Sequence, residues 1–214
     1  MLIVRPQSPA EAYEYLTRTL GQMSFFDANG YDLALPSHPD FDADGEVGSL
    51  EQFSRDVYSP EVFRSAMETL GAKEALLKHA LQWFARLPED ESFYVPDQYT
   101  VVLTLYGPGG SYDPQSGTIT MLTTPKGEFR GGGGAYTIVH EMMHIAVEVA
   151  LVQRFGLSHW QKERLVDALT QRELGHLLPD YQLQSQGDSR IDEAIADVPL
   201  PELAAALAAF KSAD

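Results

Sequence analysis

The segment His140-Glu141-Met142-Met143-His144 constrains the fold of this chain more than any other part of the sequence. Two histidines four residues apart lie one turn apart on the same face of an α-helix. Residues 135–155 around them are mostly apolar and show helical periodicity, which predicts a long helix whose histidines face the interior. A buried imidazole needs a polar partner, and a metal ion supplies one.

These two histidines predict a zinc site. Both imidazoles can reach one zinc ion at about 2.0–2.1 Å, so His140 and His144 are the first two predicted ligands. Glu141 lies beside them, where its carboxylate can reach a water on the metal. The simpler alternative is that the histidines are incidental and that the chain is a helical interaction domain.

A second helix is predicted downstream, beginning at Ser158 with a capping-box pattern. A catalytic zinc ion usually has three protein ligands and one open position. Glu163 follows His144 by 19 residues and is the best candidate for the third ligand, with His159 and Asp167 as alternatives. Asp167 lies one turn beyond Glu163 on the same helix face, so its carboxylate can also accept the second ring N–H of a ligating histidine.

This combination of residues resembles the gluzincin branch of the zincin metallopeptidases, whose members include thermolysin and the zinc aminopeptidases. Trp160-Gln-Lys-Glu163 is similar to the W-x-x-E of the aminopeptidases, and Glu163-Arg-Leu-Val-Asp167 is similar to the E-x-x-x-D of thermolysin. The resemblance covers about residues 99–170. The G-x-M-E-N segment with which aminopeptidases bind a free amino terminus is absent from the sequence, which favours an endopeptidase.

The resemblance implies a hydrolase that cleaves peptide or protein substrates with a zinc-activated water and Glu141 as general base. It also implies a further hydrogen-bond donor for the oxyanion, and His176, Tyr181 and Tyr136 are the open candidates for that role. An alternative within the same resemblance is a zincin-like module that binds metal without catalysis and serves regulation or interaction.

The expected architecture is a single zincin-like domain of the α+β class over residues 1–214. A small, mostly antiparallel sheet would pack on the active-site helix, and by resemblance its strand at 118–123 would be the edge strand that pairs with the substrate backbone. Residues 1–95 would form a mainly helical N-terminal part, and residues 96–214 the metal-binding catalytic core. Sequence patterns predict strands at 99–106 and 118–123, helices at 8–20 and 60–86, and a long loop at 22–49.

A second metal-binding pattern lies inside that predicted loop. It matches the calcium-loop string D-x-D-x-D-G-x5-E, in which alternating carboxylates surround a hard cation. Two prolines just before it interrupt the usual incoming helix, so an acidic solvated loop is the alternative to a Ca²⁺ site. The residues concerned are Asp40, Asp42, Asp44, Gly45 and Glu51.

Charge and residue usage exclude several other classes of function. Asp and Glu number 31 against 15 Lys and Arg, a formal net charge of -16, which disfavours binding to nucleic acid or to anionic lipid. The chain has no cysteine, so no thiolate can bind a metal or act as a nucleophile. We expect no signal peptide and no segment apolar enough to span a bilayer, so the protein is either cytoplasmic or exported with its signal removed.

Overall fold

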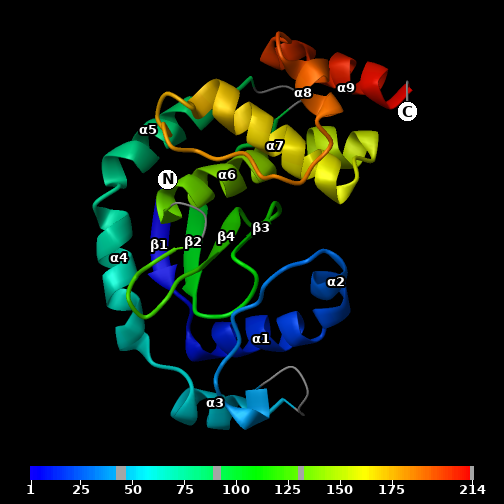
Figure 1. Ribbon diagram of the computed structural model, residues 1–214. Helices are drawn as coiled ribbons and strands as arrows, with labels where there is room; N and C mark the ends of the chain where they lie inside the picture. The colour runs from blue at the N-terminus through cyan, green and yellow to red at the C-terminus, as the bar shows by residue number, and fades with distance from the viewer. Residues whose placement is uncertain (42–46, 89–92, 130–132, 213–214) are drawn as a thin grey trace.

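A four-stranded sheet lies between two layers of helices in the computed structural model, which describes residues 1–41, 47–88, 93–129 and 133–212 (Figure 1). The strand order is β1-β2-β4-β3. The α+β class predicted from the sequence is confirmed. The strands are β1 (Leu2–Pro6), β2 (Tyr99–Thr104), β3 (Gly110–Asp113) and β4 (Thr118–Leu122).

The sheet is mostly parallel, so the expectation of a mostly antiparallel sheet is wrong. β1 pairs with β2 and β2 pairs with β4 in parallel, and only the β3–β4 pair is antiparallel. The physical reason is that the chain leaves β2 and first forms β3 at the far edge. β4 then enters between them and runs in the direction of β2. The edge strand beside the helix that carries His140 and His144 is therefore β3, and the expectation that the segment 118–123 forms the edge is also wrong.

The N-terminal part is mainly helical, although the sequence pattern missed its first strand, β1. The predicted capping box at Ser8 is present, because Ser8 N–H donates to Glu11 and Glu11 N–H donates to the Ser8 hydroxyl. The predicted loop at 22–49 is wrong in part, since it contains a helix that buries Phe26 and a 3₁₀ turn that buries Phe41. The helices here are α1 (Pro9–Leu20), α2 (Met23–Ala28), α3 (Leu50–Asp56), α4 (Arg64–Gly71) and α5 (Glu74–Phe84), with 3₁₀ turns at Pro39–Phe41 and Pro60–Phe63.

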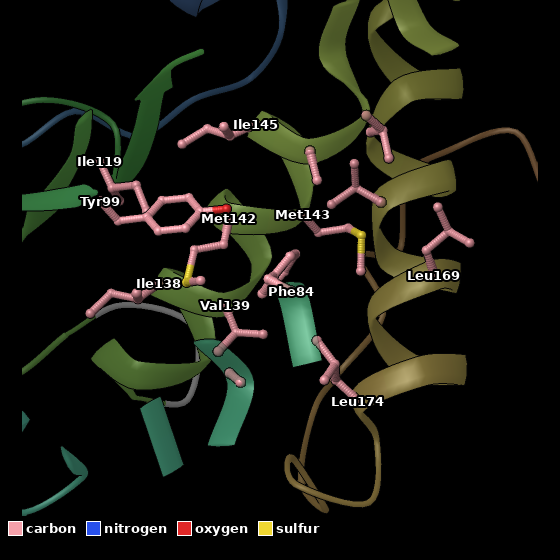
Figure 2. Close-up of a cluster of buried hydrophobic side chains, with 14 of the residues drawn as sticks. Phe84, Tyr99, Ile119, Ile138, Val139, Met142, Met143, Ile145, Leu169 and Leu174 are labelled. Atoms are coloured by element: carbon pink, nitrogen blue, oxygen red, sulfur yellow. The ribbon is translucent and has the colours of Figure 1, made fainter. Parts of the chain in front are cut away.

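Helix α6 (Gly134–Val147) carries the two histidines and continues into a π-helical segment, Glu148–Gln153, which confirms the predicted long helix. Twelve of its 14 residues are buried, as expected for a helix that is apolar around its whole circumference. Figure 2 shows its apolar side chains against the sheet, helix α5 and helix α7. The labelled core residues are Phe84, Tyr99, Ile119, Ile138, Val139, Met142, Met143, Ile145, Leu169 and Leu174.

The stretch Gly134–Gln153 is long and apolar enough to cross a membrane by length and composition alone. The expectation that no segment meets this criterion is therefore wrong. However, 67% of this window is buried inside the protein, as in the core helix of a globular domain. Its apolar side chains contact the sheet and the neighbouring helices.

Helix α7 (His159–Leu174) packs against α6 and begins with the predicted capping box, in which Ser158 and Gln161 exchange hydrogen bonds. Gly156 precedes it with φ +58°, a left-handed conformation that glycine adopts without strain and that turns the chain sharply between the two helices. The chain ends in α8 (Arg190–Ile195), a 3₁₀ turn at Leu200–Glu202 and α9 (Leu203–Ser212), which lie on the outer side of α7 (Figure 1).

Candidate metal centre

Helices α6 and α7 bring His140, His144 and Glu163 together as a group that could hold a metal ion. His140 Nε2 lies 3.0 Å from His144 Nε2. Glu163 Oε2 lies 3.6 Å from His140 Nε2 and 3.3 Å from His144 Nε2. A tetrahedral ion with bonds of about 2.0–2.1 Å needs donor atoms about 3.3 Å apart. The three measured separations bracket that value, so the donor set fits such an ion.

Hydrogen bonds on the far side of His140 orient its ring. His140 Nδ1 lies 2.6 Å from the Tyr181 hydroxyl and 3.3 Å from Asp167 Oδ1. Tyr181 donates to the same Asp167 oxygen at 2.6 Å, and the Gln184 backbone N–H donates to the other at 2.7 Å. With its own proton on Nδ1, the ring presents the Nε2 lone pair to the other ligands. Burial alone would lower the pKa of His140, but hydrogen bonds with Asp167 and Glu163 raise it to about 10. Near neutral pH a metal ion would therefore displace a proton from Nε2 on binding.

The ring of His144 is held differently. Its side chain is 2% exposed, and burial lowers the pKa of His144 to about 4, which keeps the ring neutral and able to ligate. The ring of Tyr112, from β3, lies nearly flat against it, with 4.7 Å between ring centroids and 11° between planes.

Glu163 is buried in the same cluster and acts as a carboxylate. Burial would raise its pKa, but hydrogen bonds with His140 and His144 lower the pKa of Glu163 well below its usual range. Gln184 Nε2 donates to Glu163 Oε2 at 3.0 Å, and Lys162 Nζ lies 3.4 Å from Oε1.

The two alternatives for the third ligand occupy other positions. His159 Nδ1 stands 3.9 Å from Glu163 Oε1, while its Nε2 lies 2.9 Å from the Tyr31 hydroxyl. Asp167 lies behind His140, on the side of the ring away from the other ligands. Among the alternatives predicted from the sequence, Glu163 is thus the one grouped with the two histidines.

Glu141 lies beside this cluster on the next position of α6. Its side chain is buried and faces β3, where Gly110 leaves room for the carboxylate, since a β-carbon at position 110 would overlap Glu141 Oε1. Burial raises the pKa of Glu141 to about 7, with a further contribution from Glu163, against the opposing effects of His140 and Lys162. A carboxyl group with such a pKa can accept and return a proton near neutral pH.

The cluster borders a cleft of about 940 Å³ between the N-terminal helices and the helix pair α6–α7. Of the three open candidates for an oxyanion donor, Tyr136 and Tyr181 line the cleft, while His176 is exposed and is not among its lining residues. The Tyr181 hydroxyl already donates to Asp167.

Sequence reasoning missed several residues of this cleft. Tyr31 and the half-exposed Phe25 come from the N-terminal part, while Tyr112 and Lys162 lie closer to the cluster. No sequence motif includes Phe25, Tyr31 or Tyr112. Lys162 occupies one of the two variable positions of the W-x-x-E string, which the pattern leaves unspecified.

The predicted calcium loop lies mostly outside the described residues, since Asp42, Asp44 and Gly45 fall between the described ranges. Asp40 accepts a hydrogen bond from the side chain of Gln52. Glu51 is exposed in the first turn of α3. The Ca²⁺ site stays a sequence prediction.

The chain was compared with protein-family models, with curated proteins and with solved structures, and none of them matches it. What the site can do is therefore inferred from the residues that form it.

Proposed function

We propose that this protein is a zinc-dependent metallopeptidase of the gluzincin type, which hydrolyses internal bonds of peptide or protein substrates. One observation carries the proposal: the ligand atoms of His140, His144 and Glu163 converge beside the buried carboxylate of Glu141, at the edge of a large cleft. Two imidazoles and one carboxylate at these separations suit zinc, and three protein ligands leave its fourth position open to a substrate or water.

In the proposed reaction the residues of the site have separate roles. Zinc, when bound, supplies Lewis acidity that polarises a peptide carbonyl and acidifies a water. Glu141 takes the proton from the attacking water and passes it to the leaving amine, which completes the addition of water across the C–N bond. Asp167 and Tyr181 hold the Nδ1 proton of His140 throughout, so that its Nε2 keeps its orientation.

The position of β3 supports a polypeptide substrate. Within the described residues, β3 forms its ladder with β4 on one side, and its residues line the cleft. An extended peptide can add to such an edge by main-chain hydrogen bonds. Because β3 begins at Gly110, which lies against Glu141, a peptide along this edge would bring a backbone carbonyl close to the general base.

The buried carboxylate of Glu141 favours catalysis over a metal-binding module without activity. A module that only binds metal needs the three ligands, but it gains nothing from a further residue, an acid that burial holds at an elevated pKa. Burying a carboxyl group beside an open cleft costs stability, and general-base catalysis explains why the fold keeps it there.

Hydrolysis of casein and of a mixed peptide library, with and without a chelator, tests this proposal. Glu141→Gln should retain the metal and lose at least about 10²-fold in hydrolysis, because an amide cannot accept the proton. Glu68→Gln, at an exposed position on α4, is the matched control and should cleave as fast as the parent. Chelator-resistant cleavage, or full activity in Glu141→Gln, would exclude the proposed mechanism.

A further inference from the structure

The two histidines of the cluster differ in how their second ring nitrogen is satisfied. His140 Nδ1 contacts Tyr181 and Asp167. His144 Nε2 faces the other two ligands, and its Nδ1 has no hydrogen-bond partner within the described part of the chain. Ligating histidines usually have their orientation fixed by a hydrogen bond at this second nitrogen. Another interaction must therefore fix the ring of His144.

The ring of Tyr112 is placed to do this. It lies almost parallel to the His144 ring, at 11° and a centroid separation of 4.7 Å, within the range of offset stacking. An imidazole in such a stack cannot rotate about its χ2 bond without losing the contact. Tyr112 thus restrains the one torsion that aims Nε2 at the other ligands.

Tyr112 is itself held from two sides. Its hydroxyl donates to Glu148 Oε2 at 2.5 Å and accepts a hydrogen bond from Lys162 Nζ at 3.3 Å. Glu148 opens the π-helical segment that follows α6, and Lys162 precedes the ligand Glu163 on α7. The phenol is therefore fixed by both helices that carry the metal ligands, while its backbone belongs to β3.

Stacking of this kind is stronger when a metal is bound. A cation on Nε2 withdraws electrons from the imidazole, which makes its face more positive. The face of the Tyr112 ring is negative, and it also attracts the Lys162 ammonium, which lies 5.4 Å from the ring centroid. The attraction between an electron-rich ring and an electron-poor one resembles a cation–π interaction and favours the metal-bound form.

We propose that Tyr112 is a positioning residue, which stacks on His144 to hold it in the ligating orientation and thereby raises the affinity of the centre for zinc. The inference rests on the proposed zinc site and extends it to the edge strand. Since β3 also borders the cleft, a peptide that adds to this strand would bind next to the residue that restrains a ligand.

Zinc affinity of two variants tests the proposal, measured by competition with a chromophoric chelator. Tyr112→Leu keeps an apolar side chain of adequate size but has no ring, and it should bind zinc at least tenfold more weakly. Tyr112→Phe keeps the ring and loses the hydroxyl, so its affinity should fall by no more than about threefold. Tyr94→Leu, at an exposed tyrosine that is not among the residues lining the cleft, is the control and should bind zinc like the parent. Equal affinities for the parent and Tyr112→Leu would overturn the proposal.

A second measurement on metal-free protein separates this proposal from the function proposed above. The NMR signals of the His144 ring protons should show an upfield ring-current shift in the parent and in Tyr112→Phe, and should lose it in Tyr112→Leu. A parent that binds no zinc but shows this dependence would refute the metallopeptidase and leave the restraint by Tyr112 intact. A parent that binds zinc without this shift would leave the metallopeptidase intact and refute the restraint.

Discussion

Gly110→Ala is a sharp test of Glu141, because it changes no ionisable group. The φ angle of Gly110 lies outside the left-handed region, so alanine fits the backbone, and alanine replaces glycine in a strand without strain. The new methyl group would meet Glu141 Oε1, overlapping it by roughly 1 Å relative to normal contact. It would also lie 2.9 Å from Thr137 Cγ2. The carboxylate, as the free end of a flexible side chain, is the group that moves.

The displacement should slow catalysis with little effect on the fold. Misplacing a reacting group by about 1 Å costs about 10²-fold in rate, equivalent to about 2.7 kcal/mol of activation free energy. The free energy of unfolding should change by less than about 1 kcal/mol, since only a side-chain end shifts. Zinc content should stay that of the parent, because the three atoms nearest to the new methyl belong to Glu141 and Thr137 and not to a ligand.

Three measurements check this prediction: kcat/KM on a peptide substrate, zinc content, and urea unfolding. Gly71→Ala is the matched control, because a β-carbon there meets no atom within 4 Å. If Gly110→Ala hydrolyses as fast as the parent with an unchanged zinc content, Glu141 does not act from its present position. If both zinc and activity are lost together, the gap at Gly110 serves the metal site rather than the base.

Two further variants test an interaction that orients a predicted metal ligand and an ion pair that stabilises the fold. Asp167→Asn should weaken zinc binding by about 10–100-fold, because an amide holds the Nδ1 proton of His140 less well than a carboxylate does. Competition with a chelator measures the zinc Kd, and an unchanged Kd would contradict this prediction. Hydrogen bonds with Arg5 and Ser8 lower the pKa of Glu11 to about 2, below its unfolded value of about 4.3. Its contribution to stability is therefore present above pH ~4.3 and is lost as the pH falls toward 2. Since the Glu11 side chain is 40% exposed, Glu11→Gln should lower the free energy of unfolding by at most about 1 kcal/mol at pH 7 and by almost nothing at pH 2. Urea unfolding at both pH values measures this, and equal losses of unfolding free energy would refute it.

The features that could be predicted from the sequence depend on interactions between residues that are close together in the chain. The capping boxes at Ser8 and Ser158 depend on hydrogen bonds between residues three apart, and both are present. The grouping of His140 with His144 follows from helical geometry alone. Glu163 could be anticipated because a short π-helical segment and a sharp turn connect α6 to the start of α7, which limits where Glu163 can lie.

The features that the sequence did not predict depend on contacts between distant segments. The parallel pairing of β1 with β2 joins residues nearly 100 positions apart, and no local pattern encodes it. β3 is four residues long and begins in a glycine-rich turn, so its propensity for a strand is weak. Tyr31 reaches His159 only because α2 packs against the start of α7, a contact that tertiary structure alone creates.

The central claim is that His140, His144 and Glu163 hold one zinc ion, and elemental analysis of the purified protein tests it most directly. The account predicts one equivalent of zinc in the parent, much less in Glu163→Ala, and a full equivalent in Glu173→Ala, a glutamate on the same helix outside the cluster. A parent free of zinc after growth with the metal, or a Glu163→Ala variant that retains a full equivalent, would contradict it.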